Sequence, residues 1–171
     1  MRSYLDIETG PLGEVTVLGV YIPGRLMLQL VGDEVTEENI LWYLTGVSEI
    51  CTYNGNCFDL PVIRNRIGVD LKQHIECVDL RYACQRQGLK GGLKAVERIL
   101  GITRRHPGMG GWDAVRLWSR WSRSKDVGAL RVLLEYNQDD CINLCYLEAL
   151  LDGAEPTQAT DHDYLLLPPL L

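Results

Sequence analysis

The spacing of apolar residues changes along this chain, and the change restricts the possible folds more than any other feature. Short runs rich in Val, Leu and Ile, which are typical of strands, come first, at residues 4–7, 15–22, 25–31 and 49–53. Later apolar residues recur at the i, i+3 and i+4 positions of helices, over residues 89–100, 112–121 and 128–151. This order predicts an α/β fold in which helices surround a mixed sheet.

Local signals place several boundaries. The Pro23-Gly24 pair separates two strand-like runs and predicts a hairpin, so the sheet is expected to open with antiparallel strands. Thr36 precedes two glutamates and predicts the N-cap of a helix that reaches about residue 46. Pro61 suits the first turn of a helix over residues 60–67. We also expect a last short strand at 78–80, a helix end at Gly101 and a loop over 104–111.

A length of 171 residues favours one domain, which we predict over residues 1–151 with a C-terminal tail over 152–171. Apolar residues make up 46% and charged residues 23%, which excludes extended disorder and a coiled coil for the whole chain. No apolar run approaches the ~20 residues of a membrane helix, and Asp6 interrupts any signal-peptide core. We therefore expect a cytoplasmic protein that does not bind membranes. Without a C-x-x-C pair, the six cysteines are expected to be reduced and buried.

The charge is distributed unevenly. The chain carries a net charge of −6, which would normally repel nucleic acid. Residues 86–131, however, hold 11 Lys or Arg against three acidic residues, a local balance of +8. Such a segment predicts either a local footprint for phosphates or cations that merely solvate helix faces. His106 lies in the loop of this segment and is expected to be exposed.

The first acidic motif is Asp6-Ile7-Glu8. Residues two apart in a strand point to the same face, so the two carboxylates should project together. Two carboxylates on one face of an apolar strand are costly unless a cation compensates them, and oxygen ligands suit Mg²⁺ or Mn²⁺. The alternative is an edge strand with one solvated face.

The second motif runs from Asn54 to Pro61 between a strand and a helix. Asn54 and Gly55 predict a tight turn with positive φ. Asp59 falls just before the helix, where it either caps the free N–H groups or faces a metal. Phe58 is placed either at the edge of a cleft, where it stacks on a base, or in the core.

The third motif lies on the last helix. Tyr136 and Asp140 are four residues apart, so they are neighbours on one helix face. A phenol and a carboxylate one turn apart are able to hold a water between them, although such a pair is also common on surfaces. Asp139 points about 100° away and is expected to face solvent or to cap.

Taken in order, the three motifs resemble those of the DEDD-type 3′–5′ exonucleases, in the branch with a tyrosine before the last aspartate (DEDDy). The resemblance spans residues 4–145, and the segments 93–102, 114–118 and 134–140 look most like the YprB-type predicted exonucleases. It implies a ribonuclease-H-like fold. It also implies that Tyr136 orients the attacking water and that four carboxylates bind metal: Asp6, Glu8, Asp59 and Asp140.

The implied reaction is hydrolysis of the phosphodiester bond at a nucleic-acid 3′ end, with two divalent cations, Mg²⁺ or Mn²⁺. The expected substrate is a single-stranded 3′ end of DNA or RNA, contacted by Asn54, Gly55, Phe58, Arg104 and Arg105. Two other functions stay open at this point. One is a non-catalytic nucleic-acid-binding clamp on the same fold, which would bind without metal. The other is an interaction module whose carboxylates hold a structural cation.

Overall fold

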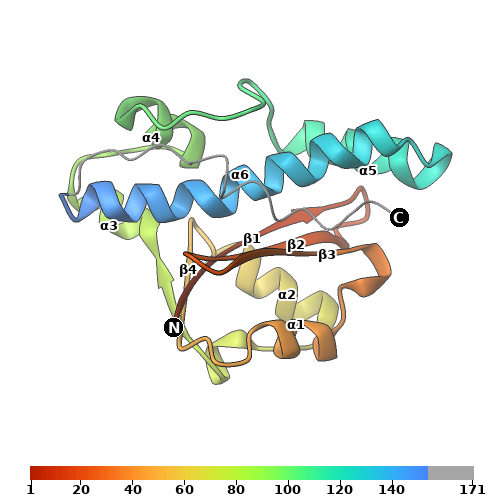
Figure 1. The fold of residues 1–171 in the computed structure, drawn as a ribbon, viewed down its shortest axis with the longest axis horizontal. Coiled ribbons are helices and arrows are strands. Elements are labelled where there is room, and N and C mark those ends of the chain that lie inside the picture. The colour runs from red at the N-terminus through yellow and green to blue at the C-terminus, as the bar shows by residue number, and fades with distance from the viewer. Residues whose placement is uncertain (154–171) are drawn as a thin grey trace.

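The strand-forming runs of the first half pair into one five-stranded sheet (Figure 1). The computed structural model describes residues 1–153. Its strands are β1 Arg2–Thr9, β2 Val15–Ile22, β3 Leu26–Val31, β4 Glu49–Thr52 and β5 Glu76–Asp79. They lie in the order β3-β2-β1-β4-β5, with β1, β2 and β3 antiparallel and with β4 parallel to both β1 and β5. The predicted mixed sheet with antiparallel opening strands is therefore confirmed.

Helices cover both faces of this sheet (Figure 1). One face carries α1 Glu37–Tyr43 and α2 Asp59–Ile67, together with the short 3-10 turns Gly32–Glu34 and Leu71–Gln73. The long helix α6 Val127–Leu151 crosses the other face over β1 and β2. Three helices pack against α6: α3 Leu80–Arg86, α4 Leu93–Leu100 and α5 Gly111–Ser124.

The alternation of side chains along β1 decides which residues face α6. Leu5 and Ile7 belong to an apolar cluster with residues of α1 and α2. Tyr4 instead packs with apolar residues of α6. Since residues two apart share a face, Asp6 and Glu8 lie on the α6 side of the sheet with Tyr4. The layer between the sheet and α6 therefore contains two carboxylates.

Several boundaries agree with the sequence prediction. The Thr36 side chain caps α1 by accepting a hydrogen bond from the Asn39 amide at 3.2 Å. Gly101 ends α4 in the left-handed region, with φ of 75°. Residues 104–110 form no helix or strand, as predicted.

Other boundaries correct the prediction. Helix α3 was not predicted, because it contributes only two buried residues, Leu80 and Cys84. The helix expected from residue 89 begins at Leu93, since Gly91 has φ of 112° and interrupts the turn. The last strand is Glu76–Asp79, and the first helix ends at Tyr43. The predicted tail over 152–171 lies outside the described residues from 154 onward.

Within residues 1–153 no helix is long and apolar enough to cross a membrane. All six cysteines lie in this range and are free. Cys51, Cys84 and Cys141 are buried, as expected. Cys57 is exposed, while Cys77 and Cys145 are half-buried, so the expectation that all six are buried is wrong.

Candidate active site

Three carboxylates from distant parts of the chain meet between β1 and α6. Side-chain oxygens of Asp6, Glu8 and Asp140 all lie within 4.8 Å of one another. The pleat of β1 directs Asp6 and Glu8 toward α6. Helix α6 packs on β1 and contributes Asp140 to the cluster. Glu8 and Asp140 are buried, and Asp6 is half-buried.

The electrostatics of this cluster favour a cation. Burial is the main reason that the pKa values of Asp6 and Glu8 lie well above their usual range, and the charge of Asp140 raises both further. Three carboxylates so close cannot all stay ionised without a compensating positive charge. A donor set made only of carboxylate oxygens suits a hard divalent cation such as Mg²⁺ or Mn²⁺. The residues therefore fit the metal site that the sequence predicts.

Asp59 lies beside this cluster without belonging to it. It is the first residue of α2, and Phe58 occupies the N-cap position that we expected for Asp59. The Ile7 amide, between the two acids of β1, donates a hydrogen bond to Asp59 Oδ1 at 3.2 Å. Burial raises the pKa of Asp59 to about 7. Asp59 is thus fixed against the same strand but is not among the three carboxylates that share one centre.

Tyr136 lies one helical turn before Asp140 and is 2% exposed. Its hydroxyl accepts a hydrogen bond from the Lys94 ammonium. Lys94 Nζ is also 3.9 Å from Asp140 Oδ2. Burial and the charge of Asp140 raise the pKa of the Tyr136 hydroxyl far above its usual range. The phenol therefore stays protonated. Lys94 donates to a lone pair of the Tyr136 oxygen, so the O–H of Tyr136 remains available as a donor.

Arg104 points into the protein, and its contact with substrate stays a prediction. The Arg104 side chain is only 8% exposed and forms ion pairs with Glu97 and Asp140. Its Nη2 donates to Glu97 Oε1 at 2.8 Å. Glu97 is fully buried and also accepts a hydrogen bond from Asn143 at 2.9 Å. A buried carboxylate needs such a countercharge, so Arg104 faces inward.

The next two residues of the loop also face α6. Arg105 Nε donates to Asp139 Oδ1 at 2.8 Å, so this arginine too is engaged within the protein. Asp139 is buried, which contradicts the expectation that it faces solvent. The ring of His106 is 2.6 Å from Glu135 Oε2 and only partly exposed, rather than a free loop residue. The basic loop therefore pairs with the acidic face of α6, because both are brought together by the packing of α4 and α6.

A groove of about 550 Å³ opens beside the carboxylates. Asp6, Asp140 and Lys94 form one part of its wall, and Asn54 and Arg81 form another. Arg81 donates a hydrogen bond to the Asn54 side-chain oxygen. The rest of the lining comes from Tyr53, Gly91, Gly92 and Leu93. The groove thus joins the candidate metal ligands to two cationic side chains.

The turn that carries Asn54 has the predicted conformation. Asn54 has φ of 64°, and the Asp79 carboxylate accepts its backbone N–H at 2.8 Å. Gly55 lies where a Cβ atom would be 2.2 Å from the Thr52 hydroxyl, so packing alone requires glycine there. Phe58 is 44% exposed, and neither it nor Gly55 lines the groove. Substrate contact by Gly55 and Phe58 stays a prediction.

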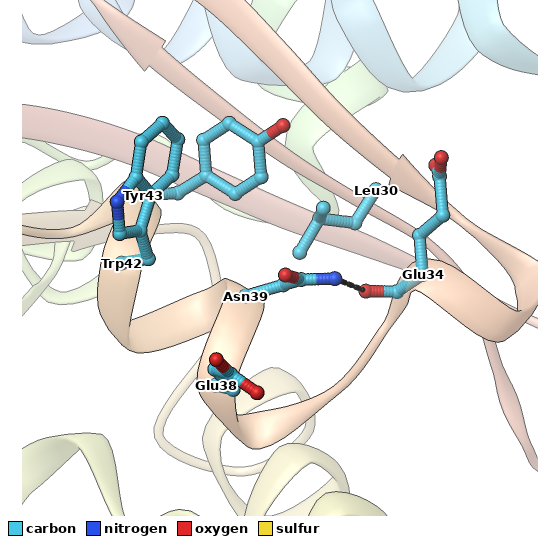
Figure 2. Close-up of a pocket in the computed structure, with 6 residues that line it drawn as sticks. All are labelled: Leu30, Glu34, Glu38, Asn39, Trp42 and Tyr43. Atoms are coloured by element: carbon cyan, nitrogen blue, oxygen red, sulfur yellow. Dashed lines mark hydrogen bonds between the residues drawn. The ribbon is translucent and has the colours of Figure 1, made fainter.

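A second groove lies on the opposite face of the sheet and does not join this site. It measures about 470 Å³ and is lined by Leu30, Glu34, Glu38, Asn39, Trp42 and Tyr43 (Figure 2). The Asn39 amide donates to the Glu34 carbonyl at 2.8 Å, which ties the start of α1 to the turn before it (Figure 2). This second groove and the three clustered carboxylates lie on opposite faces of the sheet, because α1 packs on the face away from α6.

Sequence reasoning missed several polar residues of the site region, among them Arg81, Glu97 and Asn137. The last two were detectable as polar residues within apolar stripes. Glu97 follows Leu93 by one helical turn on the buried face of α4. Asn137 follows Leu133 by one turn on the face of α6 that packs on the sheet. A polar side chain at such a position must find a buried partner.

Comparisons with known proteins agree with this fold. The sequence model of the RNase_H superfamily matches residues 3–151. No curated protein matches the chain. Among solved structures, the family B DNA polymerase from the hyperthermophilic archaeon Pyrobaculum calidifontis is similar, with a TM-score of 0.65 and 19% sequence identity. The match covers 87% of this chain but 24% of the polymerase chain, so this chain spans about a quarter of that protein's length.

Proposed function

The chain belongs to the RNase_H superfamily, and we propose that it is a metal-dependent 3′–5′ exonuclease of the DEDDy type. The observation that carries the proposal is the meeting of Asp6, Glu8 and Asp140 near the Tyr136 hydroxyl, with Asp6 and Asp140 in the wall of a groove. A carboxylate cluster alone would also suit a structural cation. A neutral phenol and a cation-lined groove next to it favour hydrolysis of an anionic substrate.

We assign the metal-binding role to Asp6, Glu8 and Asp140, with Asp59 as a ligand of a second cation. Asp59 is held against β1 by the Ile7 amide, on the same strand segment as the two acids. Bound Mg²⁺ or Mn²⁺ would lower the pKa of a water nucleophile and stabilise the departing 3′ oxygen. The side chains of Asp6, Asp59 and Asp140 each accept a hydrogen bond from another residue of the protein.

Tyr136 orients the attacking water in this proposal. Its hydroxyl accepts a hydrogen bond from Lys94, while the residue packs in an apolar cluster with residues of α5 and α6. The attacking water would first lose a proton to solvent, and the protonated phenol would donate its hydrogen bond to one lone pair of the resulting hydroxide, which leaves another lone pair for attack on the phosphorus. The Lys94 ammonium stands beside the same point and lowers the cost of bringing a negatively charged phosphodiester to the carboxylates.

The substrate we propose is a single-stranded 3′ end of DNA or RNA. The groove offers the side chains of Arg81 and Lys94 for phosphates and the amide of Asn54 for a base or sugar. Substrate contact by Arg104 and Arg105, which form ion pairs within the protein, stays a prediction. The resemblance to YprB-type exonucleases agrees with this assignment.

The proposal is tested with single-stranded DNA and RNA oligomers and Mg²⁺, Mn²⁺ or EDTA. We expect cleavage with a divalent cation, none in EDTA, and none from Asp6→Asn or Asp140→Asn, because an amide is a poor substitute for a charged ligand. Both variants should remain folded: Asp6→Asn removes one of several repelling carboxylates, and in Asp140→Asn the Arg104 side chain keeps its ion pair with Glu97. Binding without any cleavage would instead identify the protein as a nucleic-acid-binding clamp. Undiminished cleavage by Asp6→Asn would overturn the assignment of the site.

A further inference from the structure

A buried row of amides connects the far edge of the sheet to the candidate metal ligand Asp6. Gln29 lies on β3, Asn137 on α6 and Asp6 on β1. Gln29 Nε2 donates to Asn137 Oδ1 at 2.9 Å. Asn137 Nδ2 in turn donates to Asp6 Oδ2 at 3.0 Å and to the Asp6 carbonyl at 3.1 Å. Asn137 is completely buried, so the contact to Asp6 is shielded from water.

The row leaves the Asn137 amide only one orientation. Gln29 Nε2 also donates to the Leu134 carbonyl at 2.8 Å, so both of its hydrogens are used. The group that faces Gln29 must therefore be the oxygen of Asn137, and the NH₂ group must face Asp6. A flipped Asn137 would set two NH₂ groups against each other and two oxygens against each other. Gln29, which does not contact Asp6, thus determines that Asn137 presents its NH₂ group to Asp6.

The sheet provides space for this contact at Gly19. Gly19 lies opposite Asp6 in the β1–β2 pairing. A Cβ atom at Gly19 would be 2.2 Å from Asn137 Oδ1 and 2.8 Å from Cys141 Sγ. Only glycine lets α6 approach β2 closely enough for the amide of Asn137 to reach Asp6. Residues of β1, β2, β3 and α6 therefore together determine the position of the Asp6 carboxylate.

We propose that Asn137 is a positioning residue that fixes the Asp6 carboxylate for cation binding, with Gln29 setting the direction of its amide. This inference rests on the proposed function. Asn137 holds one oxygen of Asp6 with a neutral donor, which orients the carboxylate without adding positive charge next to the cation. Hydrogen bonds from outer residues to a metal-binding carboxylate typically affect metal affinity by 10–100-fold.

The test is the affinity for Mn²⁺ alone, measured by calorimetry on the full chain without nucleic acid. Asn137→Leu keeps the approximate shape of the side chain and removes the donor, and we expect Mn²⁺ to bind 10–100-fold more weakly. Gln138→Leu is the matched control. Gln138 is the adjacent residue of α6, is also completely buried, and its amide has no hydrogen-bond partner within residues 1–153. Its replacement should leave Mn²⁺ affinity within twofold of the wild type.

Gln29→Leu separates positioning from a general effect on folding. This variant touches no candidate ligand, yet it should weaken Mn²⁺ binding because it releases the amide of Asn137. The double variant Gln29→Leu/Asn137→Leu should bind no more weakly than Asn137→Leu alone, since both changes act through one contact. If Asn137→Leu fails to fold, as judged by circular dichroism, Gln29→Leu alone decides the question.

The outcomes distinguish this inference from the proposed function. Suppose that Asp6→Asn loses Mn²⁺ affinity but folded Asn137→Leu binds Mn²⁺ as tightly as the wild type. That result would overturn the positioning role and leave the metal site intact. If only Gln29→Leu folds, wild-type affinity in that variant has the same meaning. Equal losses in Gln138→Leu and Asn137→Leu would also overturn it, because the effect would then be one of helix packing. A wild-type protein that binds no Mn²⁺, or an Asp6→Asn variant that binds it as well as the wild type, would overturn the proposed function and the inference with it.

Discussion

Replacement of Arg104 by Ala tests whether a buried ion pair supports the site. The side chains of Arg104 and Glu97 are 8% and 1% exposed, so water screens their interaction little. Arg104 also pairs with Asp140. Removal of Arg104 leaves the buried Glu97 carboxylate without its ion-pair partner, and breaking a buried pair in this way costs about 3–5 kcal/mol. The free energy of unfolding of Arg104→Ala should fall by that amount in urea denaturation without added metal.

An exposed pair serves as the control for this measurement. Arg116 is 75% exposed and pairs with Asp113 one turn away on α5. Exposed pairs contribute at most about 1 kcal/mol, so Arg116→Ala should change stability little. At about 2–4 °C per kcal/mol, Arg104→Ala should also lower the Tm by roughly 6–20 °C. A loss in Arg104→Ala no larger than that in Arg116→Ala would refute the view that Arg104 is a structural cation of the site.

Three further predictions concern the site and the groove. Tyr136→Phe should slow cleavage by about 10²–10⁴-fold while calorimetric Mn²⁺ binding stays unchanged, and an undiminished rate would show that Tyr136 only packs. Because burial raises the pKa of Asp59 to about 7, folding without metal takes up a proton between about pH 4 and 7, and stability falls as the pH rises through this range. Asp59→Asn should reduce that fall in urea denaturation at a series of pH values, and an unchanged fall would contradict the assignment. Arg81→Ala should flatten the slope of log affinity against log salt by about 0.7 when single-strand binding is measured in Ca²⁺. Arg64→Ala on α2 should leave that slope unchanged. Equal slopes for the two variants would show that Arg81 does not contact the substrate.

The acidic site was predictable because its geometry follows from local periodicity. Asp6 and Glu8 share a face of β1 through the pleat, and Tyr136 and Asp140 share a face of α6 through the helical turn. The packing of α6 on the sheet then needs only to bring these two faces together. Fold class was predictable for a similar reason, since the strand-like runs all lie in the first half of the chain and helical periodicity fills the second half.

The partners of Arg104 and Arg105 were not predictable from sequence. A basic loop looks the same whether it faces solvent or a buried acidic helix face, and tertiary packing alone decides between them. Here Asp139 and Glu97 are buried, and each requires a cation that this loop supplies. Part of the local excess of positive charge is therefore neutralised inside the protein.

The most direct test of the proposed activity uses one single-stranded oligomer labelled at its 5′ end, incubated with the wild-type protein and Mn²⁺ and separated on a denaturing gel. A 3′–5′ exonuclease should produce a ladder of labelled products that shortens with time by single nucleotides, and Asp140→Asn should leave the oligomer intact. Immediate release of the label as a mononucleotide would contradict the proposed direction. An oligomer that stays intact with wild-type protein under these conditions would contradict the assignment of the carboxylate cluster as a nuclease site.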